Sequence, residues 1–85
     1  MDGTDKQVAW AEQIRTATVT ALREYVAANA PADKRAAADS EVDRILAAVD
    51  AGEGNRASWW IDSRNDAGIV PLPILAQYAR RAGVK

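Results

Sequence analysis

The sequence predicts an all-α protein, a small compact bundle of two longer and two short helices. Three observations predict this class. Apolar residues make up 48% of the 85 residues, and many of them are alanine, which favours helix over strand. Apolar residues recur at spacings of three and four along most of the chain. Runs of β-branched residues, which would build strands, are few. The length allows one domain, residues 1–85, with residues 1–3 and 84–85 expected to be disordered ends.

The first longer helix is predicted over residues 5–29. Thr4 and Gln7 have the spacing of a capping box, in which each side chain satisfies a backbone amide of the other. Pro31 disfavours helical geometry at the residue before it and ends the run. An apolar stripe at helical spacing follows the cap, and Leu22 and Val26 widen it: Trp10, Ile14, Ala17, Ala21 and Tyr25. We therefore expect Trp10 to lie in the core.

The second longer helix follows Pro31 and ends near Gly52, a typical C-terminal cap. Its apolar face has the spacing i, i+3, i+4, i+7 and consists of Val42, Ile45, Leu46 and Val49. Ser40 is a residue type that can begin a fresh helix. Residues 33–39 are therefore either a separate turn or the first half of one continuous helix.

The first short helix is predicted over residues 56–64, "RASWWIDSR", since the polar residues after the tryptophans are poor strand formers. Asn55 is a candidate to cap it. On a helix Trp60 shares a face with Ile61 and is expected in the core, whereas Trp59 points about 100° away. Trp59 is then either a boundary residue of the bundle or an anchor for a partner.

The second short helix has Pro73 in its first turn and Gly83 at its end. One apolar face consists of Ile74, Leu75, Tyr78 and Ala82. Arg80 and Arg81 lie near its C-terminus, where the helix dipole favours cations. With Lys85 they could also contact phosphates, although the dipole and solubility role is favoured.

The composition argues against most enzymes. The chain has no histidine and no cysteine, so the commonest general base and the common metal ligands are missing, and we expect no catalytic residue, no metal and no cofactor. Asp39 and Asp43 are expected to form a solvated acidic face rather than a catalytic pair. The start "MDGTDKQ" has no secretory character, and the apolar run "IVPLPILA" is short and broken by prolines, so we expect a cytoplasmic protein without a membrane span.

Two segments resemble a group of small proteins encoded by phages and other mobile elements. Their pattern is K-Q-x-x-W-A-x-x-I-R followed later by a W-W-I-D-x-R-like segment. Residues 6–15 match its first part through Lys6, Gln7, Trp10, Ala11, Ile14 and Arg15, and residues 59–64 match its second part through Trp59, Trp60, Ile61, Asp62 and Arg64. Most of the group is uncharacterised, and at least one related member is an anti-CRISPR protein acting on a type I system. We expect the two segments to pack together, with Arg15, Asp62 and Arg64 linked at the edge of the contact.

These observations favour a non-enzymatic protein-binding module of a phage or mobile element, such as an inhibitor of a type I CRISPR effector complex. The expected partner is a host protein complex, bound through Trp59, Arg56, Arg64, Arg80 and Arg81. The alternative is a nucleic-acid-binding accessory protein that uses the basic C-terminal helix. The balance of 11 basic and 12 acidic residues makes nucleic acid the less favoured partner. A third reading is self-association through the alanine-rich second helix, so the expected state is a monomer or a weak homodimer.

Overall fold

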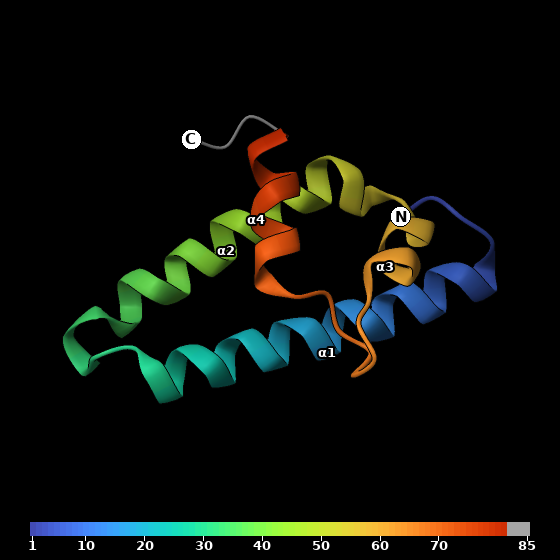
Figure 1. Ribbon diagram of the computed structural model, residues 1–85. Helices are drawn as coiled ribbons and strands as arrows, with labels where there is room; N and C mark the ends of the chain where they lie inside the picture. The colour runs from blue at the N-terminus through green and yellow to red at the C-terminus, as the bar shows by residue number, and fades with distance from the viewer. Residues whose placement is uncertain (82–85) are drawn as a thin grey trace.

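Four helices make up the fold, as predicted. The computed structural model describes residues 1–81, and within them no β-strand is formed. The helices are α1 (Asp5–Asn29), α2 (Arg35–Ala51), α3 (Ala57–Ser63) and α4 (Leu72–Arg81). The two long helices form a splayed hairpin, while α3 packs on α1 and α4 on α2 (Figure 1). Two longer and two shorter helices are therefore confirmed. Of the described helices, none is long and apolar enough to cross a bilayer.

The predicted start and end of α1 are confirmed. The Thr4 amide donates to Oε1 of Gln7 over 3.0 Å, and the Gln7 amide donates to Oγ1 of Thr4 over 3.2 Å, which completes the capping box. At the other end, the Ala30 amide donates to the Val26 carbonyl over 2.9 Å, and the chain is extended before Pro31.

The buried side of α1 differs from the predicted stripe. It consists of Ala11, Ile14, Thr18, Leu22 and Val26. Trp10 is 45% exposed and Tyr25 is 60% exposed, so the expectation that Trp10 lies in the core is wrong. The buried side is centred on Thr18, a polar residue that an apolar pattern leaves out. Its burial is possible because the hydroxyl donates to the Ile14 carbonyl over 2.7 Å and accepts from the Val70 amide over 2.9 Å.

The second helix is not broken at Ser40. A 3₁₀ turn at Ala32–Lys34 leads into α2, which then runs without interruption to Ala51. The predicted end at Gly52 is confirmed, since its amide donates to the carbonyls of Ala48 and Val49 over 3.2 and 3.0 Å. Most of the predicted apolar face is buried, and Ile45 lies at its half-buried edge.

Ion pairs join α1 to α2. Arg15 of α1 binds both carboxylate oxygens of Asp50, at 3.0 and 2.6 Å, and Arg23 binds Asp39 and Asp43. The hydrogen bonds that Arg15 donates to Asp50 and Arg23 donates to Asp43 raise the pKa values of the two arginines above the ordinary arginine value. The side chains of Asp39 and Asp43 are 42% and 62% exposed, in agreement with the expected solvated face, and both also pair with Arg23 because the packing of α1 on α2 brings it within reach.

The N-terminal residues are held against the start of α3. The Asp2 amide donates to the Asn55 carbonyl over 2.6 Å, and the Ala57 amide donates to the Asp2 carbonyl over 2.8 Å. Within residues 1–3, which were expected to be a disordered end, Asp2 is thus hydrogen-bonded to the start of α3. The expected Asn55 cap is not formed, since Arg56 precedes α3 and Asp2 accepts the Ala57 amide instead. The expectations for Ala82, Gly83 and residues 84–85 lie outside the described residues.

Candidate interaction surfaces

The two adjacent tryptophans belong to the core. Trp60 is fully buried, as predicted, and its indole Nε1 donates to the Gly54 carbonyl over 2.8 Å. Trp59 is only 6% exposed. Its ring meets those of Trp60 and Tyr78 edge to face, with centroids 4.8 and 5.0 Å apart. Trp59 is therefore not a surface anchor, because the Tyr78 side chain, supplied by α4, packs against it.

The exposed tryptophan is Trp10. The guanidinium carbon of Arg64 lies 4.6 Å from the centroid of its ring, a cation–π distance, and Arg64 also donates to the Ile61 carbonyl. The expected link of Arg15 with Asp62 and Arg64 is wrong, since Arg15 binds Asp50 on α2. The two segments of the resemblance do pack together, because α3 lies against α1. Sequence reasoning missed Trp10 as a surface residue, although Trp10 and Arg64 both belong to the quoted pattern.

Arg64 also borders a surface hollow of about 530 Å³ beside α3. The residues that line it are Ile61, Asp62, Arg64, Asn65, Asp66 and Gly68. Asp62 and Asp66 are exposed, and within residues 1–81 neither forms an ion pair. With two carboxylates and one guanidinium, the lining of this hollow carries a formal net negative charge.

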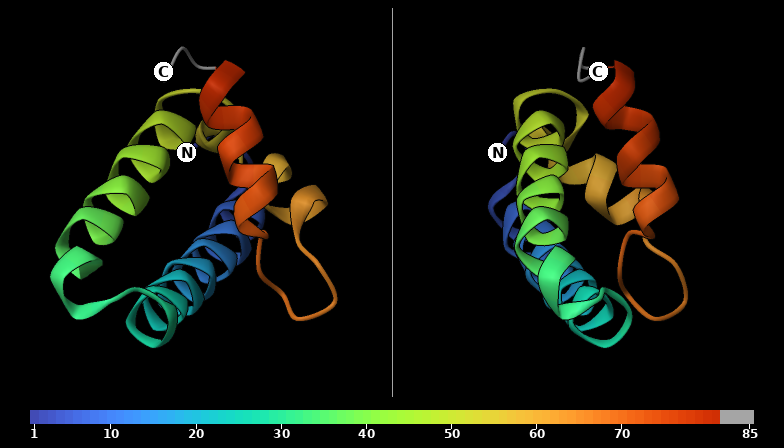
Figure 2. Two further views of the ribbon diagram at one scale, coloured as in Figure 1. Left: turned by 60° about the vertical axis from the view of Figure 1, so that its left-hand side comes forward. Right: turned by 90° about the vertical axis from the view of Figure 1, so that its left-hand side faces the viewer.

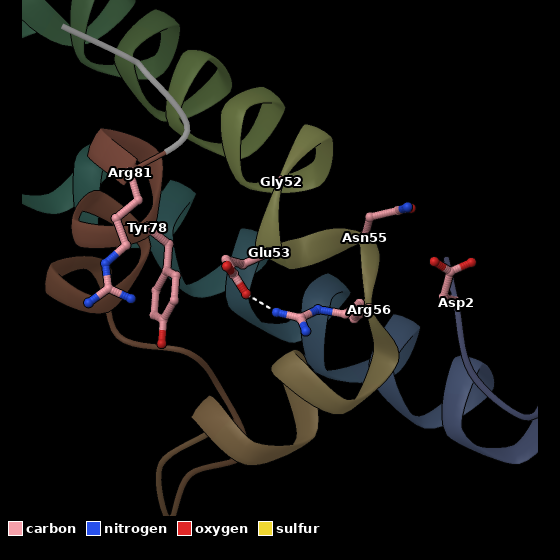
Figure 3. A pocket seen from close by; sticks show the side chains of 7 residues that line it. All are labelled: Asp2, Gly52, Glu53, Asn55, Arg56, Tyr78 and Arg81. Atoms are coloured by element: carbon pink, nitrogen blue, oxygen red, sulfur yellow. Dashed lines mark hydrogen bonds and ion pairs between the residues drawn. The ribbon is translucent and has the colours of Figure 1, made fainter.

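A second hollow, of about 510 Å³, brings together Arg56 and Arg81 (Figure 3). Its lining residues are Asp2, Gly52, Glu53, Asn55, Arg56, Tyr78 and Arg81. Arg56 forms an ion pair with Glu53, and the guanidinium carbon of Arg81 lies 5.0 Å from the centroid of the Tyr78 ring. Acidic and basic side chains thus alternate around the hollow, which weakens its attraction for a polyanion.

The predicted basic residues do not form one patch. Arg56 and Arg81 share a hollow, Arg64 lines a different one, and Arg80 is exposed on α4 without lining either. Lys85 lies outside the described residues. A nucleic-acid surface needs clustered, unneutralised cations, so this arrangement gives the nucleic-acid alternative no support.

A third hollow, of about 410 Å³, is apolar. It lies between α1 and the start of α4 and is lined by Ala21, Leu22, Tyr25, Ile69, Leu72 and Pro73. Tyr25 forms its exposed rim. This hollow was not predicted, because it depends on where the loop 64–71 meets α1.

The acidic residues of the described part of the chain do not cluster into a metal site. Over residues 1–81, no three side chains of histidine, cysteine, aspartate or glutamate lie close enough together to hold an ion. In comparisons with known proteins, no family model, no curated protein and no solved structure matches this chain. The resemblance carried by residues 6–15 and 59–64 therefore stays a prediction.

Proposed function

We propose that this protein is a non-enzymatic protein-binding module whose contact surface is centred on Trp10 and Arg64. The observation that carries the proposal is the 45% exposed Trp10 ring with the Arg64 guanidinium stacked on it. Tryptophan and arginine are the side chains that most often dominate the energy of protein interfaces. Stacking also fixes the guanidinium before a partner arrives, which lowers the entropy cost of binding.

The absence of histidine and cysteine from the chain supports a binding role over an enzymatic one. The surface charges support a protein partner rather than nucleic acid, since Arg56 is neutralised by Glu53 and the arginines are dispersed.

For the partner, we propose a host protein complex in the bacterial cytoplasm, with a type I CRISPR effector as the specific candidate. This part rests on the resemblance to proteins of phages and mobile elements, one of which is an anti-CRISPR protein. Trp10 and Arg64 both belong to the residues that carry the resemblance. The module acts as a monomer or weak homodimer that occupies a surface of the effector.

The test compares Trp10→Ala with Glu12→Ala. Glu12 is exposed and lies two residues further along α1, so it points to the opposite side of the helix. Each variant is used as bait in a pull-down from a bacterial host with a type I CRISPR system. CRISPR interference in that host is measured while the variant is expressed. Trp10→Ala should melt close to the wild type but bind about 30-fold more weakly, since a hot-spot residue contributes roughly 2 kcal/mol or more.

Glu12→Ala should bind as the wild type does. The binding role is refuted if the wild type retains no specific protein and leaves interference undisturbed. The assignment of the surface is refuted if Trp10→Ala, while folded, binds and inhibits as well as the wild type.

A further inference from the structure

The first residues of the chain join the starts of two helices. The Asp2 amide donates to the Asn55 carbonyl over 2.6 Å, and the Asp2 carbonyl accepts from the Ala57 amide over 2.8 Å. Two residues after Asp2, Thr4 caps α1. No side chain of the described residues caps α3, so Asp2 satisfies a backbone amide that a helix start otherwise leaves unpaired. We call residues 2–3 the strap.

The second residue of the strap, Gly3, lies between α1 and α3. A Cβ atom at this position would stand 2.9 Å from Cβ of Ala57 and 3.2 Å from Oε1 of Gln7. The φ angle of Gly3 is +149°, which a side chain would also strain. Ala57 is fully buried, so the close-packed core holds it in place. Only glycine therefore lets the strap pass between the starts of α1 and α3 at this spacing.

The same two helices carry the proposed contact surface. α3 lies beside the N-terminal half of α1 (Figure 2). Trp10 lies six residues beyond Thr4, and Arg64 lies seven residues beyond Ala57. At 1.5 Å per helical residue these separations are roughly 9 and 10 Å. The contact of 4.6 Å between the Arg64 guanidinium carbon and the Trp10 ring centroid thus spans the two helices, and its geometry depends on how α3 lies against α1.

Two points of attachment fix the direction of α3. The helix has seven residues and is too short to be stable without packing. Trp59 and Trp60, near its middle, are buried and hold its position in the core. A helix held only at its middle can tilt about that point, and the strap holds its start at Ala57. Arg64 lies on the other side of the tryptophans from Ala57, so a displacement of the start of α3 also displaces Arg64.

We propose that Gly3 is a positioning residue for the contact surface. The strap sets the angle of α3 on α1 and thereby holds the Arg64 guanidinium on the Trp10 ring. A side chain at position 3 pushes the starts of α1 and α3 apart and tilts Arg64 off the ring. Both contact residues are then present but no longer preorganised for a partner. This inference rests on the proposed binding role, and it adds that a residue outside the contact surface controls the geometry of that surface.

The test compares Gly3→Ala with Asp2→Ala by NMR of the full chain without a partner. Asp2 makes its strap contacts through its backbone, so Asp2→Ala keeps them and is the matched control. Arg64→Gln gives the chemical shift of the Trp10 indole without a stacked guanidinium. In Gly3→Ala the indole should move toward that shift. The Ala57 amide should exchange at least about tenfold faster, the factor expected for the loss of one or two hydrogen bonds. Asp2→Ala should change neither.

Two further variants separate positioning from a general loss of stability. Gly3→Ala in the Arg64→Gln background should leave the Trp10 indole unmoved, because Gly3 acts on it through Arg64. Val42→Ala opens a cavity on α2, far from the strap in the sequence, and should lower the melting temperature without moving the indole. An indole shift in Val42→Ala, or a wild-type indole in Gly3→Ala, overturns the inference.

Asp2→Pro keeps the test decisive if Gly3→Ala fails to fold. It removes the amide that donates to Asn55 without adding bulk beside Ala57, and it should shift the Trp10 indole in the same direction. An unmoved indole in Asp2→Pro overturns the inference. All these measurements are made without a partner, so their failure leaves the proposed function standing, and that function fails only in the host binding experiment.

Discussion

The two adjacent tryptophans provide a matched test of buried hydrogen bonding. Both rings are buried, but the Trp60 indole donates to the Gly54 carbonyl over 2.8 Å, whereas the Trp59 indole finds no acceptor among the described residues. Replacing either by phenylalanine removes a similar volume. Trp60→Phe also leaves the buried Gly54 carbonyl unpaired, which destabilises the fold by about 1–3 kcal/mol. Trp59→Phe has the opposite effect, because it removes an unpaired buried donor that destabilises the wild type by a similar amount.

We therefore expect Trp60→Phe to lower the free energy of unfolding by about 2 kcal/mol or more beyond Trp59→Phe. Urea unfolding of both variants, followed by circular dichroism, measures this difference directly. Trp→Phe changes are preferred to Trp→Ala, since a large cavity would cost about 3–5 kcal/mol at either site and hide the effect. Equal losses, or a larger loss for Trp59→Phe, would refute the reasoning and show that the Trp59 indole is satisfied in solution.

Three further substitutions test the fold. Thr18→Val keeps the shape of the side chain but leaves the buried Val70 amide without its acceptor. It should lower the free energy of unfolding in urea by about 1–3 kcal/mol and speed hydrogen exchange of that amide. Unchanged exchange would contradict this role of Thr18. Gly54→Ala would place its Cβ 2.5 Å from Cγ1 and 2.7 Å from the carbonyl oxygen of Val49, and should lower stability by about 1–3 kcal/mol or more, as a thermal melt would show. Arg15→Gln removes a partly exposed ion pair with Asp50 and should lower the free energy of unfolding by only about 0.2–1 kcal/mol. This loss should be smaller at high salt, because salt screens exposed charges. A loss that does not depend on salt would show that Arg15 stabilises the fold by packing instead.

The local features of the chain were predictable because they depend on neighbouring residues. The capping box of Thr4 and Gln7, the end of α1 before Pro31 and the end of α2 at Gly52 all involve partners within four residues. The phase of α1 was not predictable in the same way. A single amphipathic pattern suggested that Trp10 and Tyr25 face inward, but the helix packs around Thr18, which Val70 of a distant loop satisfies.

The sequence predicted only part of the candidate contact surface. Arg64 was named from the sequence, whereas Trp10 was assigned to the core and Trp59 to a possible contact. Their places are exchanged in the structure because α4 supplies Tyr78 to cover Trp59, while no described helix covers Trp10. Whether each tryptophan is covered depends on how helices distant in the sequence pack, and no local pattern contains that information.

By itself, the sequence determined that this protein is helical, where α1 begins and ends and where α2 ends, and that histidine and cysteine chemistry is excluded. These properties follow from composition and from interactions between residues close in the chain. Only the tertiary structure decided which side of α1 is buried, that Asp39, Asp43 and Asp50 bind arginines of α1, and that the stacked Trp10 and Arg64 lie at the surface. The physical reason is that burial and ion pairing depend on which helix packs against which, and packing joins residues that the chain keeps far apart.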